Sequence, residues 1–217
     1  MDLHNELTRL RRMILSMGAS VEQRVAEAFD SVLARDINEA RAVRTGDDEI
    51  DAMDLDVEAE CLRILALSHP VAGDLRFVLS VIRINTDLER MADLATSIAK
   101  RVIAMDDQAS PIELPPALAE MASCTQRMLG DALKALADED AALCYRVRKS
   151  DDRVDDLLKE LFVWAQQEIP RNVETTPFAI NVLSIARKIE RIADMTTNIA
   201  EDVLFLIDGS IVRHSKS

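Results

Sequence analysis

The chain has 217 residues, of which 48% are hydrophobic and only 3% aromatic, with five glycines and a formal net charge of −13. So few turn-forming and aromatic residues argue against a β-sandwich, and the charge argues against nucleic acid as a partner, because phosphate contacts need clustered cations. Three cysteines without a paired spacing, and apolar runs far shorter than a membrane span, lead us to expect a cytoplasmic protein.

The first half of the chain is predicted to form three helices. Apolar residues at intervals of three and four predict a helix over 3–33. Asp36 is a suitable N-cap for a second helix that reaches Leu67, where a Ser-His-Pro sequence interrupts the pattern. A third helix over 74–105 carries an uninterrupted heptad seam, which is typical of helical bundles. The seam consists of Phe77, Val81, Ile84, Leu88, Met91, Ala95, Ile98 and Val102.

The second half restarts this pattern after a turn-rich segment, 106–116, which we interpret as a linker. Two helices are predicted over 117–136 and 138–169. Thr176 is the predicted cap of the last helix, with Pro177 at its first position, where the missing backbone donor costs nothing. This helix repeats the earlier seam with Phe178, Val182, Ile185, Ile189, Ile192, Thr196, Ile199, Val203 and Leu206.

The two halves also share sequence. Residues 79–102 and 180–203 both centre on Glu-Arg-(Met/Ile)-Ala-Asp, at an offset of 101 residues. A second pair, 47–51 and 151–155, shares Asp-Asp-x-(Ile/Val)-Asp at an offset of 104. These matches indicate a tandem duplication.

The predicted fold is therefore all-α, with six helices arranged as two three-helix bundles. We expect residues 1–108 to form the first repeat and residues 112–217 the second. The heptad seams favour nearly antiparallel packing within each bundle.

Each of the four shared motifs places an acid four residues before an aspartate. That spacing puts both carboxylates on one helix face, where two like charges cost about 0.2–0.5 kcal/mol. Because this cost recurs in both halves, we infer that a cation offsets it. The candidate metal ligands are Asp47 and Asp51, Glu89 and Asp93, Asp151 and Asp155, and Glu190 and Asp194.

Oxygen-only ligands suit hard cations such as Mg²⁺, Mn²⁺, Ca²⁺ or iron. No histidine occurs within the motifs, which argues against a ferritin-type di-iron site and a typical catalytic zinc site. Two alternatives remain open: Arg90 and Arg191 can neutralise the acids as ion pairs, or the acidic faces are simply solvated. In the last helix Asn198, Glu201 and Asp202 extend the polar face as further possible ligands.

Over nearly its whole length the chain resembles the PhoU family of phosphate-uptake regulators. The resemblance rests on the repeated Asp-Asp-x-(Ile/Val)-Asp and Glu-Arg-x-Ala-Asp elements and on the run Thr-Asn-Ile-Ala-Glu-Asp-Val at 197–203. The first repeat departs from that run, with Ser97, Lys100 and Arg101 in place of the amide and the two acids.

The resemblance implies two similar three-helix bundles and clusters of divalent or trivalent metal ions (iron, zinc, magnesium or manganese) held by the acid motifs. It also implies a negative regulator of phosphate uptake and of the phosphate-starvation response. Such a protein is not an enzyme but an adaptor between the ATPase subunit of the high-affinity phosphate ABC transporter and its sensor histidine kinase. We expect a homodimer that reaches the membrane only through these partners.

The alternative is a metal store or metalloenzyme built on the carboxylate clusters. The missing histidine ligands, and the lack of an evident nucleophile or general base, favour the adaptor over the metalloenzyme. A purely structural helical scaffold with solvated acids is the third reading.

Overall fold

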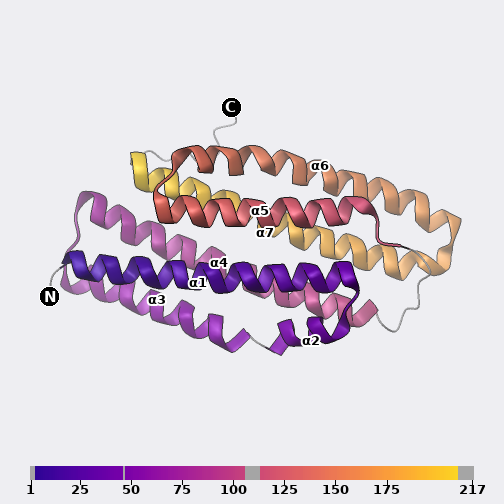
Figure 1. The fold of residues 1–217 in the computed structure, drawn as a ribbon, viewed down its shortest axis with the longest axis horizontal. Coiled ribbons are helices and arrows are strands. Elements are labelled where there is room, and N and C mark those ends of the chain that lie inside the picture. The colour runs from indigo at the N-terminus through magenta and orange to yellow at the C-terminus, as the bar shows by residue number, and fades with distance from the viewer. Residues whose placement is uncertain (1–2, 46, 106–112, 210–217) are drawn as a thin grey trace.

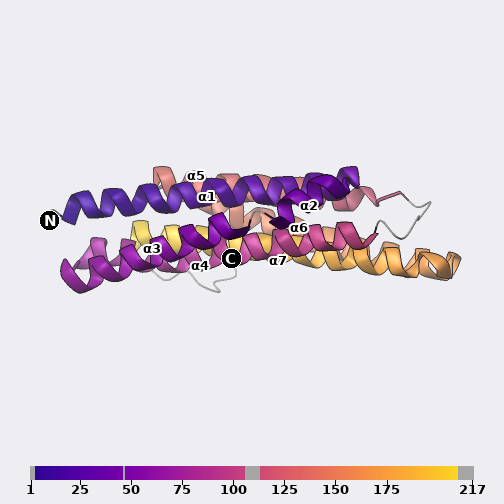
Figure 2. The same ribbon diagram turned by 90° about the horizontal axis from the view of Figure 1, so that it is seen from below.

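A computed structural model describes residues 3–45, 47–105 and 113–209, and these residues form helices joined by short turns (Figures 1 and 2). No strand occurs in these three ranges, and none of their helices is both long and apolar enough to cross a membrane. The helices are α1 (Leu3–Ala34), α2 (Ile37–Thr45), α3 (Asp47–Leu67), α4 (Ala72–Met105), α5 (Pro116–Asp138), α6 (Ala141–Arg171) and α7 (Thr176–Asp208), with a 3₁₀ turn at Val173–Thr175.

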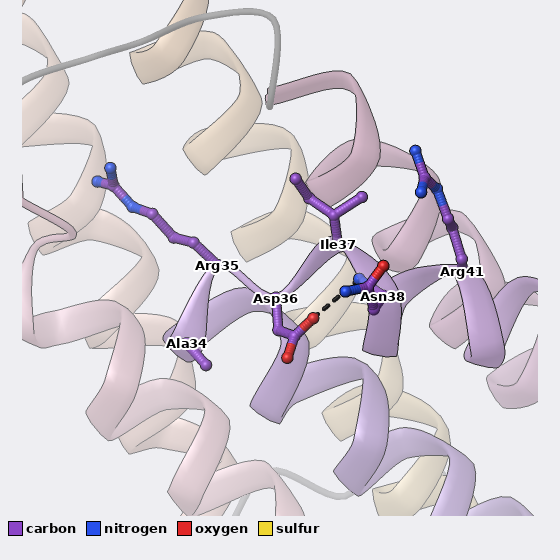
Figure 3. A pocket seen from close by; sticks show the side chains of 6 residues that line it. All are labelled: Ala34, Arg35, Asp36, Ile37, Asn38 and Arg41. Carbon is purple, nitrogen blue, oxygen red and sulfur yellow. Dashed lines mark hydrogen bonds between the residues drawn. The ribbon is translucent and has the colours of Figure 1, made fainter.

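The helices begin and end within a few residues of their predicted bounds. α2 and α3 together span the predicted second helix, and residue 46 between them lies outside the described ranges. Asp36 caps α2 as predicted, because its Oδ1 accepts hydrogen bonds from the backbone nitrogens of Asn38 (2.8 Å) and Glu39 (3.1 Å). Figure 3 shows this turn, which borders a cavity of about 540 Å³.

α7 begins differently from the prediction. Thr176 is already helical, and the N-cap is Thr175, whose side chain makes no capping hydrogen bond. The side chain of Asn172 caps the preceding 3₁₀ turn instead, accepting a hydrogen bond from the backbone nitrogen of Glu174 at 3.1 Å. Pro177 was predicted at the first helical position and lies at the second, still within the first turn of α7.

The predicted seams form the core. Every seam residue of α4 is buried, and in α7 only Leu206 is partly exposed. Each of these helices also buries a second row at seven-residue spacing. Asn85 of this row bonds to Asp54 of α3, so the row in α4 faces α3. The two rows are Val78, Asn85, Ala92 and Ala99 in α4, and Ala179, Ala186, Ala193 and Ala200 in α7.

α4 and α7 form the main contact between the two halves and run antiparallel (Figures 1 and 2). At one end the hydroxyl of Ser80 donates to the backbone oxygen of Asp202 at 3.3 Å, and Arg83 Nη1 lies 3.1 Å from Asp202 Oδ1. At the other end Arg101 Nη1 donates to Asn181 Oδ1 at 3.5 Å. The offset of 101 relates Ser80 to Asn181 and Arg101 to Asp202, so an approximate twofold axis relates the two ends.

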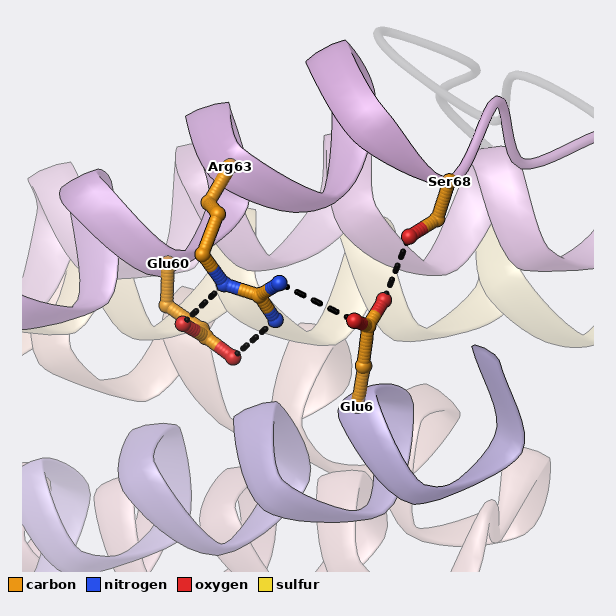
Figure 4. A network of polar contacts seen from close by, with 4 residues as sticks. All are labelled: Glu6, Glu60, Arg63 and Ser68. Carbon is orange, nitrogen blue, oxygen red and sulfur yellow. Dashed lines mark hydrogen bonds and ion pairs between the residues drawn. The ribbon is translucent and has the colours of Figure 1, made fainter. Parts of the chain in front are cut away.

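A buried polar network joins α1 to α3 (Figure 4). Arg63 Nη1 lies 2.9 Å from Glu6 Oε1, and Arg63 also makes two hydrogen bonds to Glu60, at 2.8 and 2.9 Å. The Ser68 hydroxyl donates to the second oxygen of Glu6 at 2.5 Å. Hydrogen bonds from Ser68 and then Arg63 lower the pKa of Glu6, so the network holds this carboxylate ionised.

The predicted boundary between the repeats falls on residues 106–112, which lie outside the described ranges. The two halves are in contact on both sides of the molecule, because α1 contacts α5 and α4 contacts α7. The division at 1–108 and 112–217 stays a prediction.

Candidate functional site

The four predicted acids of the second repeat share one environment on the neighbouring helices α6 and α7. Burial, followed by repulsion from Asp194, Asp155, Asp152 and Glu190, raises the pKa of Asp151 to about 7. Burial also raises the pKa of Glu190 and of Asp194, and Asp155 repels both. The packing of α6 on α7 therefore brings both acid motifs of this repeat together.

The first repeat brings together three of its four predicted acids. Burial, followed by repulsion from Asp93, Asp54 and Asp51, raises the pKa of Glu89, which lies partly buried on α4. Asp51 and Asp93 are exposed on α3 and α4. The side chain of Asp47 lies outside the described part of the chain, so its membership of this cluster stays a prediction.

Asp54 belongs to the first cluster but was not among the acids predicted from the sequence. Asn85 Nδ2 donates to its Oδ1 at 2.6 Å, while burial and repulsion from Glu58 and Asp51 raise the pKa of Asp54. The available signal was an acid three residues after Asp51, which also returns to the same helix face. Asp54 has no acidic partner four residues before it on the i, i+4 pattern of the motifs, and the second repeat has Leu158 at the equivalent position.

Two acids near the end of α7 do not extend the second cluster. Asp202 is buried against α4, where it pairs with Arg83, and Glu201 pairs with Arg148 of α6 at 3.5 Å. The structure therefore assigns both acids to ion pairs between helices rather than to a metal. Asn198 is exposed on α7.

Arg90 and Arg191 neutralise the clusters only in part. Both are exposed, and neither makes an ion pair or hydrogen bond to an acid of the described residues. Arg90 acts to lower the pKa of Glu89, and Arg191 acts to lower the pKa of Glu190 and Asp194. The pKa of each of these acids nevertheless stays raised, because burial and acid–acid repulsion outweigh the arginine.

The donor chemistry of both clusters fits a hard cation, which would relieve the repulsion among the acids. As the side chains stand, no three Asp, Glu, His or Cys residues of the described ranges lie close enough together to hold an ion. Asp155 and Asp194 are exposed, and exposed side chains change rotamer readily. Binding a cation would therefore require these carboxylates to rotate toward one another.

A cavity of about 490 Å³ opens beside the second cluster, between α6 and α7. The guanidinium of Arg187 lies over the ring of Phe162, 5.2 Å from its centroid. Burial, followed by repulsion from Arg101 and Arg191, lowers the pKa of Lys188. Positive charge thus gathers next to the acids, at a place that the sequence analysis did not identify. α7 lines the cavity with Ser184, Arg187, Lys188, Glu190 and Arg191.

The chain matches the PhoU domain twice, over residues 14–102 and 118–203. It is 35% identical to the phosphate-specific transport system accessory protein PhoU homolog of Pseudomonas aeruginosa over 213 residues, 96% of this chain and 86% of that protein.

Two solved structures share the fold. The crystal structure of PhoU from Pseudomonas aeruginosa superposes with a TM-score of 0.93 at 32% identity, covering 96% of this chain and 100% of that one. The phosphate transport system regulatory protein PhoU from Streptococcus pneumoniae gives a TM-score of 0.85 at 28% identity, covering 97% and 99%. As its repeated motifs predict, the chain belongs to the PhoU family.

Proposed function

We propose that this protein is a regulatory accessory protein of phosphate transport, which restrains phosphate uptake and the phosphate-starvation response. The observation that carries the proposal is the family match in both halves of the chain, with relatives named as accessory and regulatory proteins of phosphate transport. Those names describe accessory and regulatory proteins rather than enzymes, so we assign this chain no catalytic activity of its own.

In the finer form of this proposal, the protein is a cytoplasmic adaptor. It contacts the ATPase subunit of the high-affinity phosphate ABC transporter and the associated sensor histidine kinase, and it reaches the membrane only through them. The long, thin arrangement of helices supports this role, because it leaves broad faces available for two partners (Figures 1 and 2).

The proposal includes a homodimer. α3 carries a second apolar row that faces outward, with Leu55 63% and Leu62 57% exposed and the exposed Ala59 between them. Apolar residues four and three positions apart form the seam of a two-helix contact. The second repeat has Lys159 and Gln166 at the positions equivalent to the two leucines. One seam per chain suits an isologous pair, in which each of two copies contributes the same surface.

We also propose that the acid motifs bind divalent or trivalent metal ions: iron, zinc, magnesium or manganese. The convergence of the second-repeat acids, with the pKa of Asp151 raised to about 7, supports a cation there. The same clusters favour a second candidate function, a metal store. Tolerance of a deletion strain to added metal separates the two functions, because only loss of a store would change it.

Deleting the gene tests the regulatory function. In phosphate-rich medium the deletion should derepress phosphate-starvation genes or cause excess phosphate uptake. Because a regulator acts by binding one state of its partner better than another, deleting the transporter or the kinase as well should abolish the phenotype. The regulatory proposal fails if the deletion changes neither phosphate accumulation nor starvation-gene expression. Recovery of the ATPase subunit and the kinase in pull-downs, with and without phosphate, tests the adaptor.

A further inference from the structure

The cavity between α6 and α7 combines a cationic side with an apolar wall. Four of its lining residues follow the spacing i, i+3, i+4 and i+7, which places them on one face of α7: Ser184, Arg187, Lys188 and Arg191. Leu158 and Phe162 of α6 form the opposite wall. A volume of about 490 Å³ lies within the range of small-molecule sites, which combine apolar walls with a few convergent polar groups.

The three cations in this cavity make no direct ion pair, although Arg187 and Arg191 act to lower the pKa of the neighbouring Glu190. Neither Arg187, Lys188 nor Arg191 makes an ion pair or a hydrogen bond within the described ranges of the chain. Acids outnumber basic residues by 39 to 26, so partners were not scarce. Like charges three and four residues apart destabilise a helix, and a bound anion would offset that repulsion.

Neutralising the nearby carboxylates does not account for these cations. Both repeats keep the acid motif, but the positions equivalent to Arg187 and Lys188 hold Thr86 and Asp87 in the first repeat, at the offset of 101. Only the third cation has a counterpart, Arg90. If the cations served the acids alone, both repeats would need them. Two of the three are particular to the second repeat, as is the composition of the cavity.

We propose that this cavity binds a small phosphoryl oxyanion, either inorganic phosphate or the phosphate group of a small metabolite. The cavity offers many hydrogen-bond donors, from two guanidinium groups, an ammonium group and the Ser184 hydroxyl. These donors exceed what one carboxylate can accept, and they match the several oxygens of a doubly charged tetrahedral anion. The net charge of −13 disfavours an extended polyanion, whereas a small anion in the cavity meets three cations and the single carboxylate of Glu190.

Calorimetry on the purified full-length chain, stripped of metal with a chelator, tests this site. The probes are inorganic phosphate, adenosine monophosphate and sulfate. We expect phosphate or the nucleotide to bind more tightly than sulfate. Whichever of phosphate and adenosine monophosphate binds more tightly identifies the source of the phosphoryl group. Arg187→Gln and Lys188→Gln should each weaken binding at least tenfold, because each removes a charge-assisted contact.

Arg90→Gln is the matched control, since it removes the same charge from the equivalent face of the first repeat. It should change the affinity less than twofold, and circular dichroism should show every variant as helical as the parent chain. The proposal is overturned if neither phosphate probe binds, if sulfate binds equally well, if the control loses as much affinity, or if binding requires added Mn²⁺. The measurement uses no partner protein, so its failure leaves the regulatory function untouched.

Discussion

At the scale of single residues, Asp151 links the acid cluster to stability. Its pKa rises from an ordinary 3.8 to about 7 in the folded chain, chiefly because it is buried and secondarily because other acids surround it. A group whose pKa is raised on folding contributes stability that is fully present below about pH 4. That contribution is lost as the pH rises through about 7. The metal-free protein should therefore weaken across this range.

Asp151→Asn removes this pH dependence. In the presence of chelator the variant should be more stable than the parent chain at pH 8, by about 1–4 kcal/mol at 1.36 kcal/mol per pKa unit, and nearly equal to it at pH 4. Urea unfolding at the two pH values measures the difference. Asp138→Asn, at an exposed position at the end of α5, is the matched control. An equal gain at both pH values would contradict the account.

The metal proposal predicts how the loss of two acids changes both metal binding and metal-free stability. The double variant Glu190→Ala/Asp194→Ala should bind less metal, as measured by mass spectrometry on protein purified without a metal-affinity tag. Without metal it should be more stable, by about 0.2–0.5 kcal/mol for the relieved pair. Unchanged metal content would reject this site, and the variant Glu201→Ala serves as a control, because Glu201 pairs with Arg148.

At the scale of helices, the second buried row of α7 allows a test of how tightly the neighbouring helices pack on it. The row consists of alanines, and Ala193 has no exposed surface. Ala193→Leu should therefore destabilise the fold by about 1–3 kcal/mol through overpacking. Ala119→Leu adds the same side chain at an exposed position of α5 and should be nearly neutral. Thermal unfolding compares the two, and equal effects would show that Ala193 is not tightly packed.

The sequence was enough to predict the helices and their seams because the heptad spacing is local information. It was not enough to show that α4 is buried by four neighbouring helices, α1, α2, α3 and α7. In the sequence, the buried alanines look like ordinary helix formers. The pairing of Arg83 with Asp202 joins residues 119 positions apart, so no local pattern predicts it. The candidate site shows the same limit. Acids four residues apart were visible, whereas Asp54 and the unpaired cations of α7 needed the packing of neighbouring helices to be recognised.

At the scale of the whole molecule, the outward row of α3 predicts self-association. Leu55→Glu/Leu62→Glu should convert a dimer into a monomer, because it places acids on a seam that is already flanked by acidic residues. Light scattering coupled to gel filtration measures the mass. Val163→Glu, at an apolar position of α6 that is 51% exposed, is the matched control. A dimer that survives the double substitution would place the contact elsewhere.

The division into repeats predicts how the chain responds to being cut. Residues 1–108 and 112–217 produced as separate chains should copurify, because the contacts of α4 with α7 and of α1 with α5 need no covalent link. Copurification through a tag on one half, followed by circular dichroism, checks this. Two halves that fold without associating would show that the linker, rather than packing, holds them together.

The antiparallel contact of α4 with α7 also has an evolutionary consequence. Before duplication, a single repeat would have made this contact with a second copy of itself, with identical residues at both ends of the helix pair. Once two repeats were fused into one chain, the residues at the two ends no longer had to be identical. The equivalent positions now hold Arg101 and Asp202, of opposite charge, each bonded to a different partner. A symmetric ancestor had no means of encoding that difference, so fusion gave each end of the molecule a separate route to specialise.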